Sequence, residues 1–201
     1  MILLCIVTIF SKSTTANADD RYVKLCERYF TEFAEDYGKF GQKDGFTYLY
    51  SDKKNTATIV AIPMEQKKVA VPEKINGKTV TKIELMDVFS CSSNYYFRDE
   101  FYGEHEDNPV PKVEYLSIPK TVKVINIYAG IGLTEGYCGE LQSYLVHLKK
   151  FNVASANKWY RSYKGMLYTK NGKKLLLVPR KYMAKTVKVK KGTTKIADSA
   201  F

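Results

Sequence analysis

The chain has no apolar run long enough to cross a bilayer, which takes about 20 apolar residues in a helix. Its longest such run is Ile2 to Phe10. It is also poor in the residues of reactive and metal sites, with 4 cysteines and 2 histidines among 201 residues. No CxxC pair is present, which argues against zinc-ribbon and thioredoxin-like motifs.

The short apolar run predicts export. It is followed by a polar stretch that ends in Ala16-Asn17-Ala18, as in a signal peptide with a small-x-small cleavage site. We therefore predict a secretory signal over 1–18, a mature chain without a membrane span, and a secreted or cell-surface location. No Lys or Arg precedes the run, so either the true start lies upstream or the match is fortuitous.

Three cysteines remain after cleavage at that site: Cys26, Cys91 and Cys138. They can make at most one disulfide and would leave one thiol over. Buried free thiols that pack as small apolar residues are the favoured interpretation, and the alternative of a disulfide stays open.

Charge is unevenly distributed along the chain, whose formal net charge is +11. Residues 1–108 hold 14 Lys/Arg and 17 Asp/Glu, whereas residues 109–201 hold 18 Lys/Arg and 4 Asp/Glu. A basic half attracts acidic glycans, nucleic acid or anionic lipid. Lysines can equally coat the solvated face of a repeat protein, and charge alone does not choose a partner.

Residues 19–38 have the periodicity of an amphipathic helix. Aromatic and apolar side chains from Tyr22 to Tyr37 recur at helical spacing, Asp19 and Asp20 stand at the start, and Gly38 follows the end. We expect residues 19–45 to form an N-terminal capping helix that covers the first edge of the following domain.

From Phe46 the apolar period changes to two. Residues 46–50 and 57–62, separated by a turn at 51–55, predict a β-hairpin. An apolar-x-apolar motif then recurs as Val69-x-Val71, Leu116-x-Ile118 and Val187-x-Val189, with further pieces at Phe151-x-Val153 and Leu175-x-Leu177. Stacked coils that shelter one another's apolar side explain such a repeat, and they predict Val71, Ile118 and Val189 on adjacent rungs.

These repeats resemble the BspA-type leucine-rich-repeat family. The similar stretches are VAVPEKINGKTVTKIELMDVFSC (69–91), VEYLSIPKTVKVINIYA (113–129) and VKVKKGTTKIADSAF (187–201), and residues 148–180 resemble the family's hairpin unit. The resemblance implies a β-rich, leucine-rich-repeat-like solenoid, wound as a right-handed coil over 46–201, with insertions at 92–112 and 130–147. It places Tyr160 and Tyr168 in the packing of the hairpin. Because the chain stops in mid-repeat at Phe201, we expect a truncated fragment.

No catalytic, cofactor or metal motif is recognisable. Gly130–Gly136 is spaced GxGxxxG instead of GxGxxG, and Glu104–Asn108 lacks the ligand spacing of a calcium loop. Neither His105 nor His147 stands in a nucleophile motif. We therefore expect no enzyme activity, and a hydrolase built from the two insertions is the minor alternative.

What remains is a binding protein, for which the resemblance implies a role in adhesion or host contact. The leading hypothesis is a protein or glycan ligand at the cell surface; the alternative is a polyanion or nucleic-acid binder, although export makes nucleic acid the less natural partner. Basic and aromatic side chains of the second half are the candidate ligand-binding surface. They are Lys149, Lys150, Trp159, Tyr163, Lys173, Lys174, Lys188 and Lys190.

Overall fold

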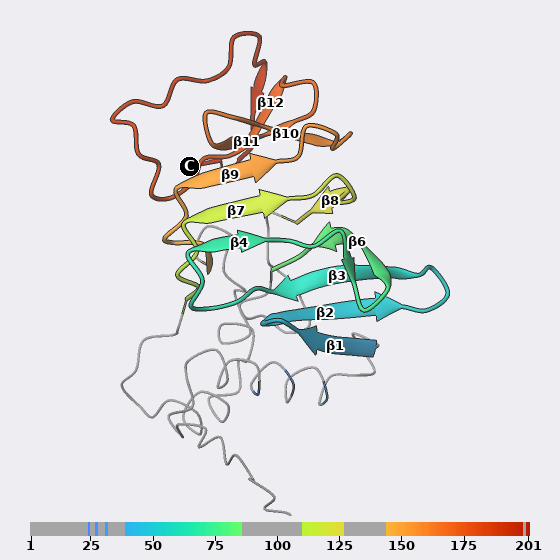
Figure 1. The fold of residues 1–201 in the computed structure, drawn as a ribbon. Coiled ribbons are helices and arrows are strands. Elements are labelled where there is room, and N and C mark those ends of the chain that lie inside the picture. Colours follow the sequence, from blue (N-terminus) through green and yellow to red (C-terminus); the bar gives the residue numbers. More distant parts are fainter. Residues whose placement is uncertain are drawn as a thin grey trace, which may run out of the picture.

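The computed structural model describes residues 39–85, 110–126, 144–198 and 200–201, and three separate positions in helical conformation, Lys24, Glu27 and Thr31. The described residues form three sheets (Figure 1). Their strands are β1 Lys39–Lys43, β2 Phe46–Ser51, β3 Thr56–Ala61, β4 Lys68–Ala70, β5 Lys74–Ile75, β6 Lys78–Ile83, β7 Tyr115–Ile118, β8 Val124–Ile125, β9 Lys150–Val153, β10 Tyr160–Tyr163, β11 Met166–Thr169, β12 Lys174–Leu177 and β13 Lys195–Ile196.

Two stacks of parallel strands face each other across the core. In the first stack β4, β7 and β9 pair in register, so that Val69, Leu116 and Phe151 lie side by side. In the second stack β6 pairs in parallel with both β3 and β8. The chain passes from the first stack to the second between β4 and β6, and again between β7 and β8 (Figure 1). Each passage makes one turn of a coil, which is the arrangement that the repeats predicted.

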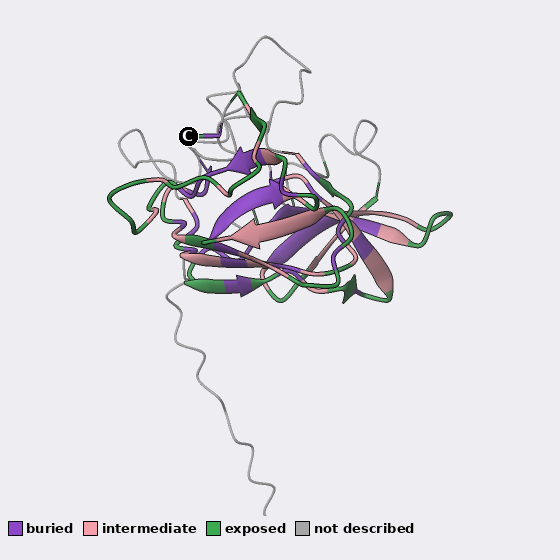
Figure 2. Ribbon diagram, turned by 90° about the horizontal axis from the view of Figure 1, so that it is seen from above, coloured by how far each residue is buried: buried purple, intermediate pink, exposed green. Residues whose placement is uncertain are grey.

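The strands pack because alternate side chains point into the space between the stacks. Val69, Leu116 and Phe151 are at most 2% exposed, and they share one apolar cluster with Ile59 and Ile83 of the opposite stack. Figure 2 shows the buried residues along the inner strands, with exposed residues mainly in the turns. A coil on its own would leave this apolar side in water, so each coil depends on its neighbours.

A second architectural feature is a duplicated hairpin module. Strands β1, β2 and β3 pair antiparallel and β3 then pairs in parallel with β6; β10, β11, β12 and β13 repeat this pattern. Both first turns have two residues with positive φ, Asp44–Gly45 (52° and 79°) and Lys164–Gly165 (51° and 86°), as a two-residue hairpin turn of the twist-compatible kind requires. Both middle strands also carry a register shift after their second residue. We call these the first and second modules.

Asn157 joins the third coil to the second. Its side chain is fully buried, and its Nδ2 donates to the carbonyls of Pro119 (2.8 Å) and Val122 (3.0 Å) in the preceding coil. Its Oδ1 accepts from the backbone N–H of Trp159 and of Tyr160, both at 2.8 Å. One amide thus satisfies four backbone groups that the turn would otherwise leave unpaired.

The stacking prediction holds for two of its three residues. The N–H of Val71 donates to the Ser117 carbonyl at 3.0 Å, which sets Val71 beside Ile118, and Ile118 pairs with Val153. Val189 is not on the next rung: residues 187–190 form no strand, and Val189 is 44% exposed. The third rung is Phe151–Val153, because the hairpin of the second module lies between β9 and residues 187–190 in the chain.

Other boundaries also differ from expectation. Residues 39–43, assigned to the capping helix, form β1, because the edge of β2 supplies their hydrogen-bond partners. The hairpin over 46–62 is confirmed as β2 and β3. The end of the second insertion contributes to the core through Tyr144 and Leu145, each 1% exposed. The described residues include only three positions of the proposed helix over 19–38; the signal segment 1–18, the three remaining cysteines, residues 92–109 and residues 130–143 lie outside them.

Candidate ligand-binding surfaces

The structure divides the predicted surface into two groups. Lys149, Lys150 and Tyr163 lie at the start of β9, where the N–H of Phe151 donates to the carbonyl of Gly165 at 2.8 Å. Lys149 is not free there, because its Nζ pairs with the Glu114 carboxylate at 2.8 Å. This hydrogen bond raises the pKa of Lys149 and lowers the pKa of Glu114. Lys150 is exposed, and the ring of Tyr163 meets the buried Tyr168 edge-on.

The second group surrounds Trp159, beyond the opposite end of β9. The N–H of Lys170 donates to the Trp159 carbonyl at 2.7 Å, which brings the β11–β12 turn, and with it Lys173 and Lys174, to this end. The indole is 38% exposed, and Nζ of Lys123 lies 5.5 Å from its ring centroid. Sequence reasoning missed Lys123, which belongs to another coil and has no local signal that links it to Trp159.

Val189 was predicted to lie on a core rung, which would leave its neighbours Lys188 and Lys190 on the outer face of a strand, and this is wrong. Val187 packs half-buried against the second core cluster, whereas Val189 faces solvent. Lys188 is exposed. The N–H of Lys190 donates to the Tyr168 hydroxyl at 3.1 Å. The Lys190 side chain passes close to Gly172, because a Cβ added to Gly172 would lie 2.9 Å from Cδ of Lys190. Only Lys190 therefore joins the group around Trp159.

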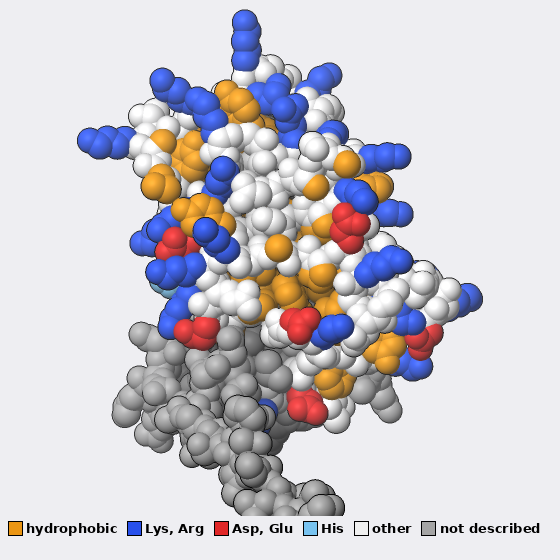
Figure 3. All heavy atoms as spheres, in the orientation of Figure 1, with side chains coloured by type: hydrophobic (Ala, Val, Ile, Leu, Met, Phe, Trp, Pro, Cys, Tyr) orange, Lys and Arg blue, Asp and Glu red, His pale blue; other side chains and the backbone are white. Residues whose placement is uncertain are grey.

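Charge pairing changes along the chain. Within the described residues, lysines up to Lys149 form ion pairs, and the lysines and arginines from residue 150 onward form none. The sequence from 150 to 201 holds 14 Lys/Arg and a single acidic residue, Asp198. Figure 3 shows the result as blue side chains without red ones over the upper part of the molecule, where β9 to β12 lie. Unpaired ammonium groups on one end give that end a positive potential.

The packing roles of two tyrosines are confirmed. Tyr168 is fully buried in the second module. Tyr160 is half-buried, its hydroxyl accepts from the N–H of Ile125 at 3.0 Å, and burial raises its pKa. Tyr160 thus links its hairpin to the preceding coil, and Tyr168 packs inside the second module.

A shallow hollow lies on the outer face of β4, β7 and β9, and sequence reasoning did not locate it. It measures about 500 Å³ and is lined by Lys68, Ala70, Tyr115, Ser117 and Asn152. A second hollow of about 340 Å³ shares Ser117 and Asn152 with it. Because Ala70 and Ser117 have small side chains, the surface is hollowed in the middle of this sheet. Figure 3 shows few charged groups there.

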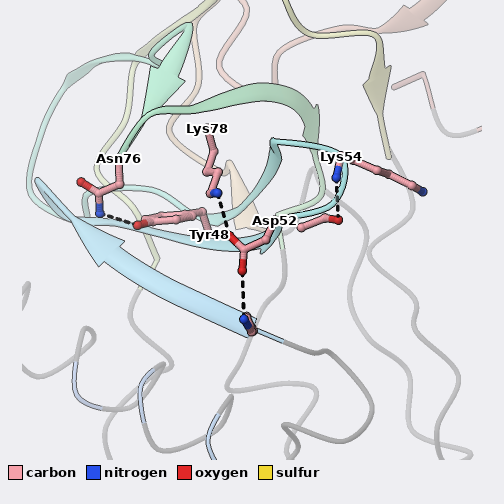
Figure 4. A network of polar contacts seen from close by, with 7 residues as sticks. Tyr48, Asp52, Lys54, Asn76 and Lys78 are labelled. Atoms are coloured by element: carbon pink, nitrogen blue, oxygen red, sulfur yellow. Dashed lines mark hydrogen bonds and ion pairs between the residues drawn. The ribbon is translucent and has the colours of Figure 1, made fainter.

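The first module carries an ion-pair network that the sequence did not reveal (Figure 4). Asp52, in the β2–β3 turn, pairs through Oδ2 with Lys39 (2.9 Å) and through Oδ1 with Lys78 (2.7 Å). The hydrogen bonds from Lys78 and Lys39 lower the pKa of Asp52 to about 2. The three partners come from β1, the β2–β3 turn and β6, so only the folded module brings them together.

Within the described residues, no cluster of three or more His, Cys, Asp or Glu side chains could hold a metal ion. His147 is exposed, and His105 and Glu104–Asn108 lie outside these residues. The same part of the chain contains no helix with the length and apolar character of a membrane span.

No family model matches the chain, and no curated protein matches it. Among solved structures, a leucine-rich repeat protein from Eubacterium ventriosum is similar with a TM-score of 0.38 and 20% identity, over 64% of this chain and 25% of that one. The pneumococcal vaccine antigen PcpA is similar with a TM-score of 0.34 and 16% identity, over 82% of this chain and 62% of that one. The chain thus spans less than two thirds of either protein.

Proposed function

We propose that the chain is a non-enzymatic, secreted or cell-surface protein of the BspA-like, leucine-rich-repeat type that binds an acidic glycan. The binding surface is the group of Trp159, Lys123, Lys170, Lys173, Lys174 and Lys190, which we call the Trp159 surface. The observation that carries this proposal is the run of lysines without ion pairs in the described residues after Lys149. Adhesion or host contact is the biological role that such binding would serve.

Uncompensated lysines suit a polymeric anion because each ammonium that approaches a sulfate or carboxylate releases counterions from the polymer. A lysine already paired with a carboxylate has less to gain, and this separates Lys173 and Lys174 from Lys149. The partly exposed indole of Trp159 adds an apolar face on which a sugar ring can stack. Lys123 beside that ring supplies a cation at the same place.

Nucleic acid is the second candidate, because it offers the same combination of charge and stackable rings. Export, which the N-terminal apolar run and its small-x-small end support, favours a glycan. A glycan would place a sugar ring on the Trp159 indole, whereas a nucleic acid would place a base there. Both ligands can therefore be compared on the same protein variants.

The test is retention of the full chain on immobilised heparin, with single-stranded DNA as the second ligand. Exchanging Lys170, Lys173 and Lys174 for Gln should lower the slope of log affinity against log salt by about 2 to 3 on heparin. The matched control exchanges Lys53, Lys54 and Lys74, which are exposed lysines of the first module, and should leave the slope unchanged. Emission of Trp159, the sole tryptophan, should change on heparin binding.

Three results would contradict the proposal. An equal decrease of the salt slope in both triple variants would indicate that heparin is attracted by net charge alone. Retention that does not depend on salt would exclude a polyanion. Tighter binding to DNA than to heparin, with the same variant sensitivity, would favour nucleic acid.

A further inference from the structure

A polar pocket of about 360 Å³ opens on the first module, away from the Trp159 surface. The β1–β2 hairpin, the β2–β3 turn and the turn before β6 enclose it, and Figure 4 shows its main side chains from close by. Its lining includes Gly41, Tyr48, Tyr50, Asp52, Asn76 and Lys78.

Asp52 and its two lysine partners together present both acceptors and donors of hydrogen bonds at this pocket. Each of its oxygens accepts from one ammonium, at 2.9 Å from Lys39 and 2.7 Å from Lys78, and each retains a further lone pair. Each ammonium in turn has two more N–H groups. The lining of the pocket itself contains one carboxylate, Asp52, and one ammonium, Lys78, so its formal charges cancel. A hydroxyl group, which donates and accepts, can use both the carboxylate and an ammonium.

Tyr48 supplies a third polar group. Its hydroxyl oxygen accepts from Nδ2 of Asn76 at 2.5 Å, so its own hydrogen remains available to a ligand. Gly41 makes this position possible, because a Cβ there would stand 2.5 Å from the Tyr48 hydroxyl oxygen. The ring itself is 3% exposed and therefore held in place. Tyr50, half-buried beside it, also lines the pocket, and Nζ of Lys78 lies 5.8 Å from the centroid of its ring.

The second module serves as an internal comparison, since it has the same strand order and first turn. Tyr168 occupies the position of Tyr48, yet its hydroxyl is used by the N–H of Lys190. The Lys190 side chain also fills the space beside Gly172. In the first module the corresponding connection, residues 62–77, ends in the β5–β6 hairpin around Asn76–Gly77, both with positive φ (44° and 77°), whereas residues 178–194 of the second module form no strand. The module thus folds without this hairpin, and the hairpin is what brings Asn76 and Lys78 to the pocket.

We propose that this pocket binds a neutral saccharide unit of hexose size. Its volume lies at the lower end of the range for small-molecule sites. Its polar groups include both donors and acceptors, which neighbouring sugar hydroxyls require, and the charges of Asp52 and Lys78 in its lining cancel. The site is independent of the Trp159 surface and does not rest on the proposed acidic glycan.

The experiment is saturation-transfer NMR on the full chain with the methyl glycosides of glucose, galactose and mannose, and with glucuronate, each up to about 20 mM, since monosaccharide affinities near 1 mM are typical of weak sites. Binding of at least one neutral glycoside is expected. Asp52→Asn should weaken it at least about 10-fold, by replacing one acceptor oxygen with a donor and removing both ion pairs. The matched control is Glu73→Gln, another exposed carboxylate paired with a lysine, Lys120, which should bind as the wild type does.

Asn76→Gly gives a second, milder variant, because a positive φ suits glycine and the backbone is kept. It should weaken binding several-fold and leave the melting temperature near that of the wild type. Absence of transfer to every neutral glycoside would overturn the proposal, and so would unchanged binding in both pocket variants. If only glucuronate binds, and the variant with Lys170, Lys173 and Lys174 exchanged for Gln loses it, the sugar contact belongs to the Trp159 surface. Loss of heparin retention in that triple variant with neutral binding intact would support both sites.

Discussion

Replacing Asn157 by alanine should uncouple the third coil from the second. The substitution removes four hydrogen bonds: two donated to the carbonyls of Pro119 and Val122, and two accepted from the N–H groups of Trp159 and Tyr160. At about 1 kcal/mol of net stabilisation each, the upper limit is about 4 kcal/mol. Water can reach some of these groups, since three of the four bonds are only partly buried, and we therefore expect a loss of about 3 kcal/mol.

Urea unfolding followed by far-ultraviolet circular dichroism measures this loss. The matched control is Asn171→Ala, because Asn171 also caps a turn through its Oδ1, but at an exposed site. It should cost less than about 1 kcal/mol. Asn157→Asp keeps the size and the acceptor but directs an oxygen at two carbonyls, so it should destabilise at least as much as alanine does. The reasoning would be refuted if the free energy of unfolding of Asn157→Ala lay within about 1 kcal/mol of the wild-type value. An Asn157→Asp variant as stable as the wild type would refute it too.

Two further predictions concern the rungs and the ion-pair network. Val69→Ala, at a 2% exposed site, should lower the free energy of unfolding by about 2 kcal/mol, whereas Val189→Ala, at a 44% exposed site, should lower it by less than about 0.5 kcal/mol; equal losses in urea unfolding would contradict the rung assignment. The carboxyl carbon of Asp52 should titrate in NMR with a midpoint near its pKa of about 2, below the ordinary 3.8, so its stabilising effect is present above pH 3.8 and is lost as pH falls through about 2. Lys78→Gln should move the midpoint toward 3.8, and an unmoved midpoint would exclude Lys78 as the main cause.

The stacking of the coils could be predicted where a strand is short, apolar on alternate positions and closed by proline. Val69-x-Val71 and Leu116-x-Ile118 meet these conditions, and they pair as expected. Val187-x-Val189 has the same letters, but Lys190 replaces the proline and its N–H is taken by the Tyr168 hydroxyl. Two alternating valines do not make a strand without a neighbour on which to pair.

The duplicated module was not visible in the sequence, because most of its corresponding positions share burial and not identity, with Tyr48 and Tyr168 among the exceptions. Phe46 corresponds to Met166 by their equivalent places in the hairpins, and Ile59 to Leu175, each pair buried. Gly45 and Gly165, both with positive φ, are the clearest shared signal. Strand β1 has no apolar alternation of its own, so only the edge of β2 defines it as a strand.

Candidate sites were harder to predict than the coils for a related reason. The lysine-rich segment was recognisable from composition, but which lysines are free depends on carboxylates elsewhere in the chain. Glu114 engages Lys149 at a separation that no local pattern marks, and Asp52 engages Lys39 and Lys78 in the same way. Ion pairing is decided by the fold, so composition alone overestimates the basic surface at Lys149.

The two modules share a backbone and differ in what occupies the space after the third strand. In the second, the connection forms no strand, and the Lys190 side chain lies beside Gly172 while its N–H donates to the Tyr168 hydroxyl. In the first, the connection ends in the β5–β6 hairpin, and Asn76 and Lys78 of this hairpin line a pocket together with Asp52. The first connection contains β4, whose Val69 belongs to the inward row of the stack, but Asn76 and Gly77 of its hairpin turn lie outside the apolar cluster. Changes confined to this turn can therefore alter the pocket while the apolar core, and with it the stability of the fold, stays the same.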